Sequence, residues 1–226
     1  MIVDTMTKAE LYKELTDDTD WLCGRLGGLA KKFNKALKNK RVADRAILEV
    51  VEYTTPNNNK VISVIQKVVI KDKYATPTIT SMFEYTTRNG MKRYIFPALD
   101  FDYDRIKYLL IFSAHAVSRM RDRLGMTIKD LLENICTIND TCTSVFKYDY
   151  NDNDNEYAVL LADCIGFAVP CDWGFMITTI INQDQEYENQ TELADTMGEH
   201  IADLSKFLTE TNNGRKELFN ILKKIA

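Results

Sequence analysis

The chain has 226 residues, of which 45% are hydrophobic and 27% charged, and its formal net charge is -4 at pH 7. This composition is ordinary for a folded protein and excludes a disordered or low-complexity chain. A negative net charge also argues against a surface that attracts nucleic acid everywhere, so any contact with a polyanion has to come from a local basic patch.

The first hundred residues predict a pair of helices followed by strands. Residues 7–10, Thr-Lys-Ala-Glu, fit a capping box, and we expect one helix over residues 8–15 and a second from residue 20 to about residue 41. Segments rich in Val, Ile, Thr, Tyr and Phe then predict an antiparallel strand meander at residues 47–53, 60–71, 78–85 and 91–96. The Asn89-Gly90 pair indicates a tight hairpin turn before the last of these strands.

A polar, acidic stretch at residues 97–105 predicts a domain boundary. We therefore expect residues 1–104 to hold the helical pair and the strand meander, and residues 105–226 to hold a helix-helix-sheet unit with two closing helices. The apolar run at residues 108–112 fits either a strand or a helix.

In the second part, we expect helices at residues 113–124 and 128–136, the latter capped by Thr127 with Asp130 near its start. The strands expected after them cover residues 143–150, 157–163, 166–170 and 175–182, and the closing helices cover residues 192–209 and 215–225. The predicted fold class is α+β, with antiparallel sheets and with helices at both ends of the chain.

Five cysteines without a CxxC pair predict neither a disulfide framework nor a zinc ribbon. We expect no cofactor and no metal site. No run of residues approaches the roughly 18 apolar positions that a membrane helix needs, so we expect a cytoplasmic protein without a membrane contact.

The most distinctive segment is residues 113–130, Ser-Ala-His-Ala-Val-Ser-Arg-Met-Arg-Asp-Arg-Leu-Gly-Met-Thr-Ile-Lys-Asp. On a helix, an apolar stripe faces the core, and a neighbouring face carries His115, Arg119 and Arg123 at successive i, i+4 positions. We call these three residues the cationic ridge. Arg121 lies on another face and is expected to face solvent.

The residue types on the cationic ridge suit phosphoryl chemistry. Histidine can donate or accept a proton near neutral pH, and arginines present fixed donors to phosphate oxygens and stabilise the charge that develops in the transition state. Metal-free cleavage of RNA also needs a base for the 2′-hydroxyl, for which Tyr148, Tyr150 or a strand residue such as Thr179 would have to lie nearby.

A structural interpretation explains the same residues without a function. Arg119 and Arg123 could pair with Asp122, Glu133 or the acidic connector, and the ring of His115 could bond to a backbone carbonyl, because charged helix faces are usually solvated faces.

The pattern His115-Ala116-x-x-Arg119-Met120-x-x-Arg123, followed by Gly125, Thr127 and Asp130, resembles small bacterial and phage domains of uncharacterised function with an HAxxRMxxR signature. Those domains look like relatives of the RelE, barnase and colicin class of ribonuclease folds. The resemblance covers residues 113–182 and implies two helices followed by a curved antiparallel sheet. Leu124 stands between Arg123 and Gly125, where the family motif runs arginine directly into glycine.

Two functions remain as hypotheses. The first is a metal-independent, ribonuclease-like or toxin-like domain that contacts RNA through a local basic patch, with His115 as general acid or base and with Arg119 and Arg123 as phosphate contacts. Phe83 and Tyr85, beside several basic residues, could offer a further surface on which bases stack, but core packing on one side of the strand and a charged edge on the other explain the same residues. The second is a non-catalytic assembly protein of phage or mobile-element origin that binds a protein partner or forms a homo-oligomer.

Overall fold

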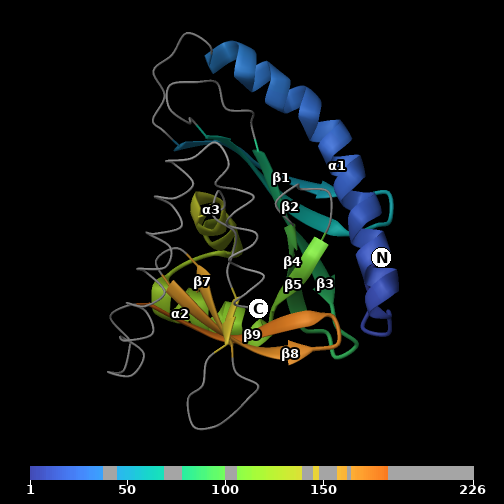
Figure 1. The fold of residues 1–226 in the computed structure, drawn as a ribbon, viewed down its shortest axis with the longest axis vertical. Coiled ribbons are helices and arrows are strands. Elements are labelled where there is room, and N and C mark those ends of the chain that lie inside the picture. Colours follow the sequence, from blue (N-terminus) through green and yellow to red (C-terminus); the bar gives the residue numbers. More distant parts are fainter. Residues whose placement is uncertain are drawn as a thin grey trace.

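The computed structural model describes residues 1–37, 45–68, 78–99, 106–138, 145–147, 157–161 and 164–182. Within these ranges the chain forms an α+β fold, as predicted, with a long N-terminal helix, a large sheet and two short helices in the middle of the chain (Figure 1). The closing helices predicted at residues 192–209 and 215–225 lie outside the described residues.

One long helix, α1 (Lys8–Leu37), opens the fold, so the predicted pair of helices is wrong. The capping box is confirmed, because Glu10 Oε2 accepts a hydrogen bond of 2.8 Å from the backbone N–H of Thr7. Residues 16–20, Thr-Asp-Asp-Thr-Asp, favour helix ends, yet the helix continues through them. The buried stripe also continues, from Leu15 on one side of this stretch to Leu22 on the other.

Asp18 explains why the helix does not break. Its side chain is 1% exposed and faces the loop between β1 (Arg45–Thr54) and β2 (Lys60–Val68). The carboxylate accepts hydrogen bonds from Thr55 Oγ1 (2.8 Å), Asn57 Nδ2 (2.9 Å) and Asn59 Nδ2 (2.7 Å). These donors replace the water that a buried carboxylate loses, so a tertiary contact outweighs the low helix propensity of aspartate.

The strands of the described residues join into a single sheet. The remaining strands are β3 (Thr78–Thr86), β4 (Lys92–Leu99), β5 (Ile106–Phe112), β6 (Val145–Lys147), β7 (Tyr157–Leu161), β8 (Cys164–Cys171) and β9 (Gly174–Asn182). The nine strands have the order β1-β2-β3-β4-β5-β9-β8-β7-β6. The pairs are antiparallel except for β5 and β9, which are parallel.

The antiparallel meander of the first part and the antiparallel strands of the second part are therefore confirmed, but the expected separate sheets are wrong. The apolar run that fitted strand or helix is the central strand β5, in which Leu109, Leu110 and Ile111 are at most 1% exposed. Since both faces of β5 are buried, its sequence carries no alternation. Strands from both sides of the boundary predicted at residues 97–105 belong to this one sheet. The division of the chain into two domains stays a prediction.

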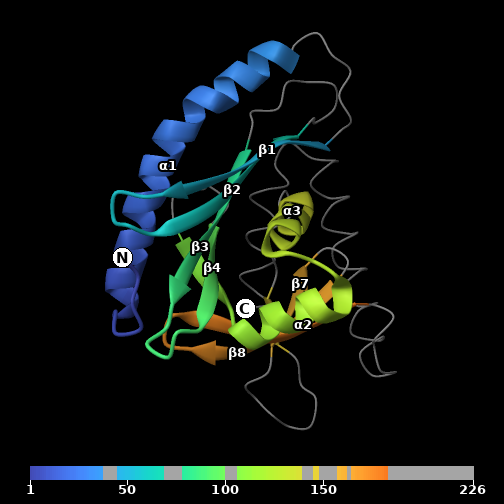
Figure 2. The same cartoon turned by 180° about the vertical axis from the view of Figure 1, so that it is seen from behind.

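Helices cover both faces of the sheet. α1 lies along one face, and α2 (Ala114–Leu124) and α3 (Ile128–Ile138) lie on the other, as the two opposite views show (Figures 1 and 2). The core under α1 includes Leu11, Leu22, Val61, Phe83, Ile95, Leu109 and Trp173. The core under α2 and α3 includes Val64, Met82, Phe96, Leu110, Ala116, Met120, Leu131, Ile135, Ile177 and Ile180. None of the helices in these ranges has the length and apolar character to cross a membrane.

Candidate functional site

The sequence sets both ends of α2, the helix that carries the cationic ridge. At its start, Ser113 Oγ accepts a hydrogen bond of 3.0 Å from the backbone N–H of Ala116. At its end, Gly125 adopts a left-handed conformation (φ 64°), and its N–H donates to the carbonyl of Arg121 at 3.1 Å. Leu124, the residue between the last arginine and the glycine of the motif, is thus the last residue of α2 and packs against the core.

The predicted helical phase is confirmed. Ala116 and Met120 are fully buried, and Val117 and Leu124 pack against the same core. The helix lies on β9, because Ile177 and Ile180 of that strand belong to the same hydrophobic cluster as Ala116 and Met120. The backbone N–H of Ser113 also donates to the carbonyl of Ile177 at 3.2 Å, which joins the start of α2 to the strand.

The cationic ridge lies along the outer side of α2. His115 and Arg123 are exposed, and Arg119 between them is half-buried. Arg119 Nη1 donates a hydrogen bond of 3.1 Å to Thr179 Oγ1 on β9. In the described part of the chain, no hydrogen bond or ion pair engages the side chain of His115 or of Arg123. The structure therefore brings one arginine of the ridge onto the sheet and leaves the other two residues open to solvent.

Asp122, the acid next to the ridge, is engaged elsewhere. Its Oδ1 lies 3.3 Å from Arg121 Nε, and its Oδ2 accepts a hydrogen bond of 3.1 Å from Ser118 Oγ. Arg121 is exposed, as predicted from the helical spacing. Of the acidic partners that the structural interpretation offered, Asp122 thus pairs with Arg121. The side chain of Glu133 and residues 100–105 lie outside what the structure describes.

Of the three residues suggested as neighbours of the cationic ridge, Thr179 alone lies within the described residues. It contacts Arg119 rather than His115, and a threonine hydroxyl at neutral pH is a hydrogen-bonding group and not a base. Tyr148 and Tyr150 lie outside the described residues.

Phe83 and Tyr85 do not form the surface considered for the stacking of bases, and the alternative of core packing on one side and a charged edge on the other is confirmed. Phe83 is fully buried and Tyr85 is 4% exposed, because both belong to the core that α1 covers. On the other face of β3, Glu84 is flanked by Lys92 Nζ at 3.1 Å and by the hydroxyl of Tyr94 at 3.2 Å. Alternation along the strand predicts that the two aromatic residues share one face of the sheet, but it does not indicate which face α1 covers.

Burial raises the pKa of Tyr94 to about 12, and the neighbouring carboxylate of Glu84 adds to the effect. Tyr94 is thus a neutral hydrogen-bond donor at physiological pH.

In the described ranges, no group of three or more His, Cys, Asp or Glu side chains converges as metal ligands would. Cys23 and Cys171 are free thiols.

The cationic ridge and Thr179 form an arrangement that can bind an anion. Two guanidinium groups and an imidazole lie on one side of a helix, and their partners inside the described protein are neutral. Arginine side chains bind phosphate oxygens through parallel N–H donors, and an exposed imidazole can exchange a proton with a bound ligand.

Comparison with protein-family models, with curated proteins and with solved structures finds no match to this chain. The resemblance to domains with the HAxxRMxxR signature therefore stays a prediction from the sequence.

Proposed function

We propose that the protein binds RNA through the cationic ridge and cleaves it without a metal ion. The observation that carries the proposal is that the adjacent acid does not neutralise the arginines of the ridge. Asp122 pairs with Arg121 and Ser118, so it does not form an ion pair with Arg119 or Arg123. Cations without an acidic partner among the described residues remain available to phosphate groups.

The proposed reaction is transfer of the phosphodiester to the neighbouring ribose hydroxyl. The 2′-hydroxyl loses its proton as its oxygen attacks phosphorus, the bond to the 5′-oxygen breaks, and the 5′-oxygen takes up a proton, so the products are a 2′,3′-cyclic phosphate and a free 5′-hydroxyl. His115 transfers one of these two protons as general acid or base and water transfers the other; the side chain of His115 is exposed enough to reach a bound strand. Arg119 and Arg123 contact the phosphate oxygens and stabilise the charge that grows in the transition state.

The order of elements after β5 supports the proposal. α2 and α3 are followed by the strands β6 to β9, which pair with one another in antiparallel fashion. This is the helix-helix-sheet order that the resemblance to the RelE, barnase and colicin class implies. Fold order alone does not define a reaction, so the ridge has to be tested directly.

The test measures the affinity of the full chain for a short fluorescein-labelled single-stranded RNA by fluorescence anisotropy at several salt concentrations. Wild-type protein should bind at low salt, and Arg123→Ala should weaken binding and reduce the slope of log affinity against log salt by roughly 0.7, the loss of one phosphate contact. Incubation of the same RNA with chelator provides the second measurement, in which His115→Ala should lose cleavage.

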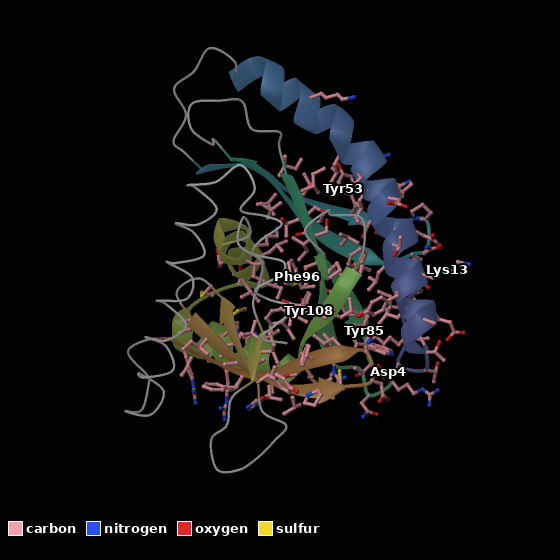
Figure 3. All side chains as sticks on the ribbon, in the orientation of Figure 1. Asp4, Lys13, Tyr53, Tyr85, Phe96 and Tyr108 are labelled. Carbon is pink, nitrogen blue, oxygen red and sulfur yellow. The ribbon has the colours of Figure 1, made fainter. Side chains whose placement is uncertain are left out.

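Lys13→Ala is the matched control. Lys13 is exposed on α1, on the opposite side of the sheet from α2, and its side chain points outward (Figure 3). The substitution removes the same charge as Arg123→Ala but should leave the affinity and the salt dependence unchanged. Equal losses for both variants would mean that RNA is attracted by overall charge and not by the ridge. No binding of wild-type protein at low salt would contradict the proposal and favour an assembly protein.

A further inference from the structure

We infer that Thr179 is a positioning residue for Arg119: its hydroxyl holds the guanidinium so that the opposite edge can bind a phosphate with two parallel hydrogen bonds. This inference rests on the proposed function and adds a residue that lies outside the signature, 60 positions further along the chain.

The hydrogen bonds of Arg119 favour this role. A guanidinium has five N–H donors in one plane, and Arg119 uses Nη1 for Thr179 at 3.1 Å. The edge formed by Nε and Nη2 has no partner in the described part of the chain. That edge is the one that matches two oxygens of a phosphate, and a guanidinium already held in place loses less entropy when it binds.

An irregularity in β9 places Thr179 where Arg119 can reach it. Phe167 of β8 pairs with Thr179, but the next residue, Ala168, pairs with Ile177, so Thr178 is an extra residue in β9. An uninterrupted strand would put residues 177 and 179 on the same face. Here Ile177 and Ile180 both pack in the core under α2, and Thr179 stays half-buried.

The bulge therefore serves two requirements at once. It keeps two isoleucines in the core under α2 and leaves a hydroxyl at the border of that core, within reach of the helix. Bulges commonly redirect a side chain beside a functional site. The same isoleucines pack in one cluster with Ala116 and Met120, so α2 and Thr179 are held in a fixed relation to each other.

Three substitutions at two adjacent residues separate positioning from general stability. Thr179→Val keeps the shape of the side chain and removes the hydroxyl, whereas Thr179→Ser keeps the hydroxyl. Thr178→Val is the matched control, because the hydroxyl of Thr178 donates to the carbonyl of Phe167 at 3.2 Å and does not contact Arg119. Valine is favoured in strands, so both valine variants should fold.

The first measurement does not depend on activity. In the NMR spectrum of the arginine side chains, the rotation of the Arg119 guanidinium should be slow in wild type, Thr179→Ser and Thr178→Val, and fast in Thr179→Val. The second measurement is cleavage of the short RNA in chelator, where Thr179→Val should lower the turnover rate about tenfold and the other two variants should retain it.

Three outcomes overturn the inference, and they can be told apart. If Thr179→Val leaves the guanidinium rotation unchanged, Thr179 does not hold Arg119. If it speeds the rotation but RNA is cleaved as fast as before, Arg119 is held for a structural reason and the proposed function survives. If wild-type protein neither binds nor cleaves RNA, the proposed function fails, and the role of Thr179 in it fails as well.

Discussion

Replacement of Asp18 by alanine should destabilise the protein strongly, although the substitution is made in the middle of a helix and favours helix formation. The carboxylate is 1% exposed and accepts hydrogen bonds from Thr55, Asn57 and Asn59. Asn57 is exposed and can bond to water after the change, whereas Thr55 and Asn59 are 4% and 2% exposed and cannot.

The expected magnitude follows from these two buried donors. Each loses a hydrogen bond to a charged group, at a cost of about 1.5–3 kcal/mol. The gain in helix propensity from aspartate to alanine offsets roughly 0.7 kcal/mol. The free energy of unfolding should therefore fall by about 2–5 kcal/mol.

Urea unfolding followed by circular dichroism measures this change, and Asp17→Ala is the matched control. Asp17 is the preceding residue of α1 and is exposed, so its replacement changes charge and propensity equally but breaks no contact in this network. Asp17→Ala should be neutral or slightly stabilising. If the two variants unfold at the same urea concentration, the Asp18 network does not join α1 to the β1–β2 loop in the way described.

Two further predictions concern the sheet. Gly174→Ala places a Cβ 2.4 Å from the backbone oxygen of Leu109 on β5, so it should lower the free energy of unfolding in urea by about 1–3 kcal/mol or more. Gly24→Ala, with open space around it, should instead stabilise α1 by about 0.5–1 kcal/mol. An equal effect of both substitutions would contradict the close approach of Gly174 to the backbone of Leu109. The pKa of Tyr94 is raised from 10.0 to about 12 in the folded protein, mainly by burial, so its contribution to stability is fully present below pH 10.0 and is lost as the pH rises toward about 12. Tyr94→Phe should remove that part of the alkaline destabilisation in a series of urea titrations, and an unchanged pH profile would contradict the assignment.

The parts of the fold that could be predicted from the sequence depend on local patterns. The capping box at Thr7 and Glu10 is a contact between residues three apart, and the buried stripe of α2 follows from helical spacing. The ridge geometry is of the same kind, since the spacing alone separates Arg121 from His115, Arg119 and Arg123.

The parts that could not be predicted depend on distant residues. Asp18 lies in a segment that favours a helix end, and its partners in the β1–β2 loop, which are distant in sequence, help to hold it in the helix. The β5 segment is apolar on both faces, so its spacing could not decide between strand and helix. The contact between Arg119 and Thr179 needs the position of β9 under α2 and the bulge at Thr178, neither of which a local pattern reveals.

The most direct test of the central claim is cleavage of single-stranded RNA in the presence of chelator by wild-type protein and by His115→Ala at the same folded concentration. His115 is exposed on α2 and engages no partner in the described part of the chain, so its replacement should leave the fold intact. We expect wild type to produce fragments ending in a 2′,3′-cyclic phosphate, and His115→Ala to bind the RNA but to produce only background levels of these fragments. Product levels that are the same for the two proteins would contradict a catalytic role for the cationic ridge.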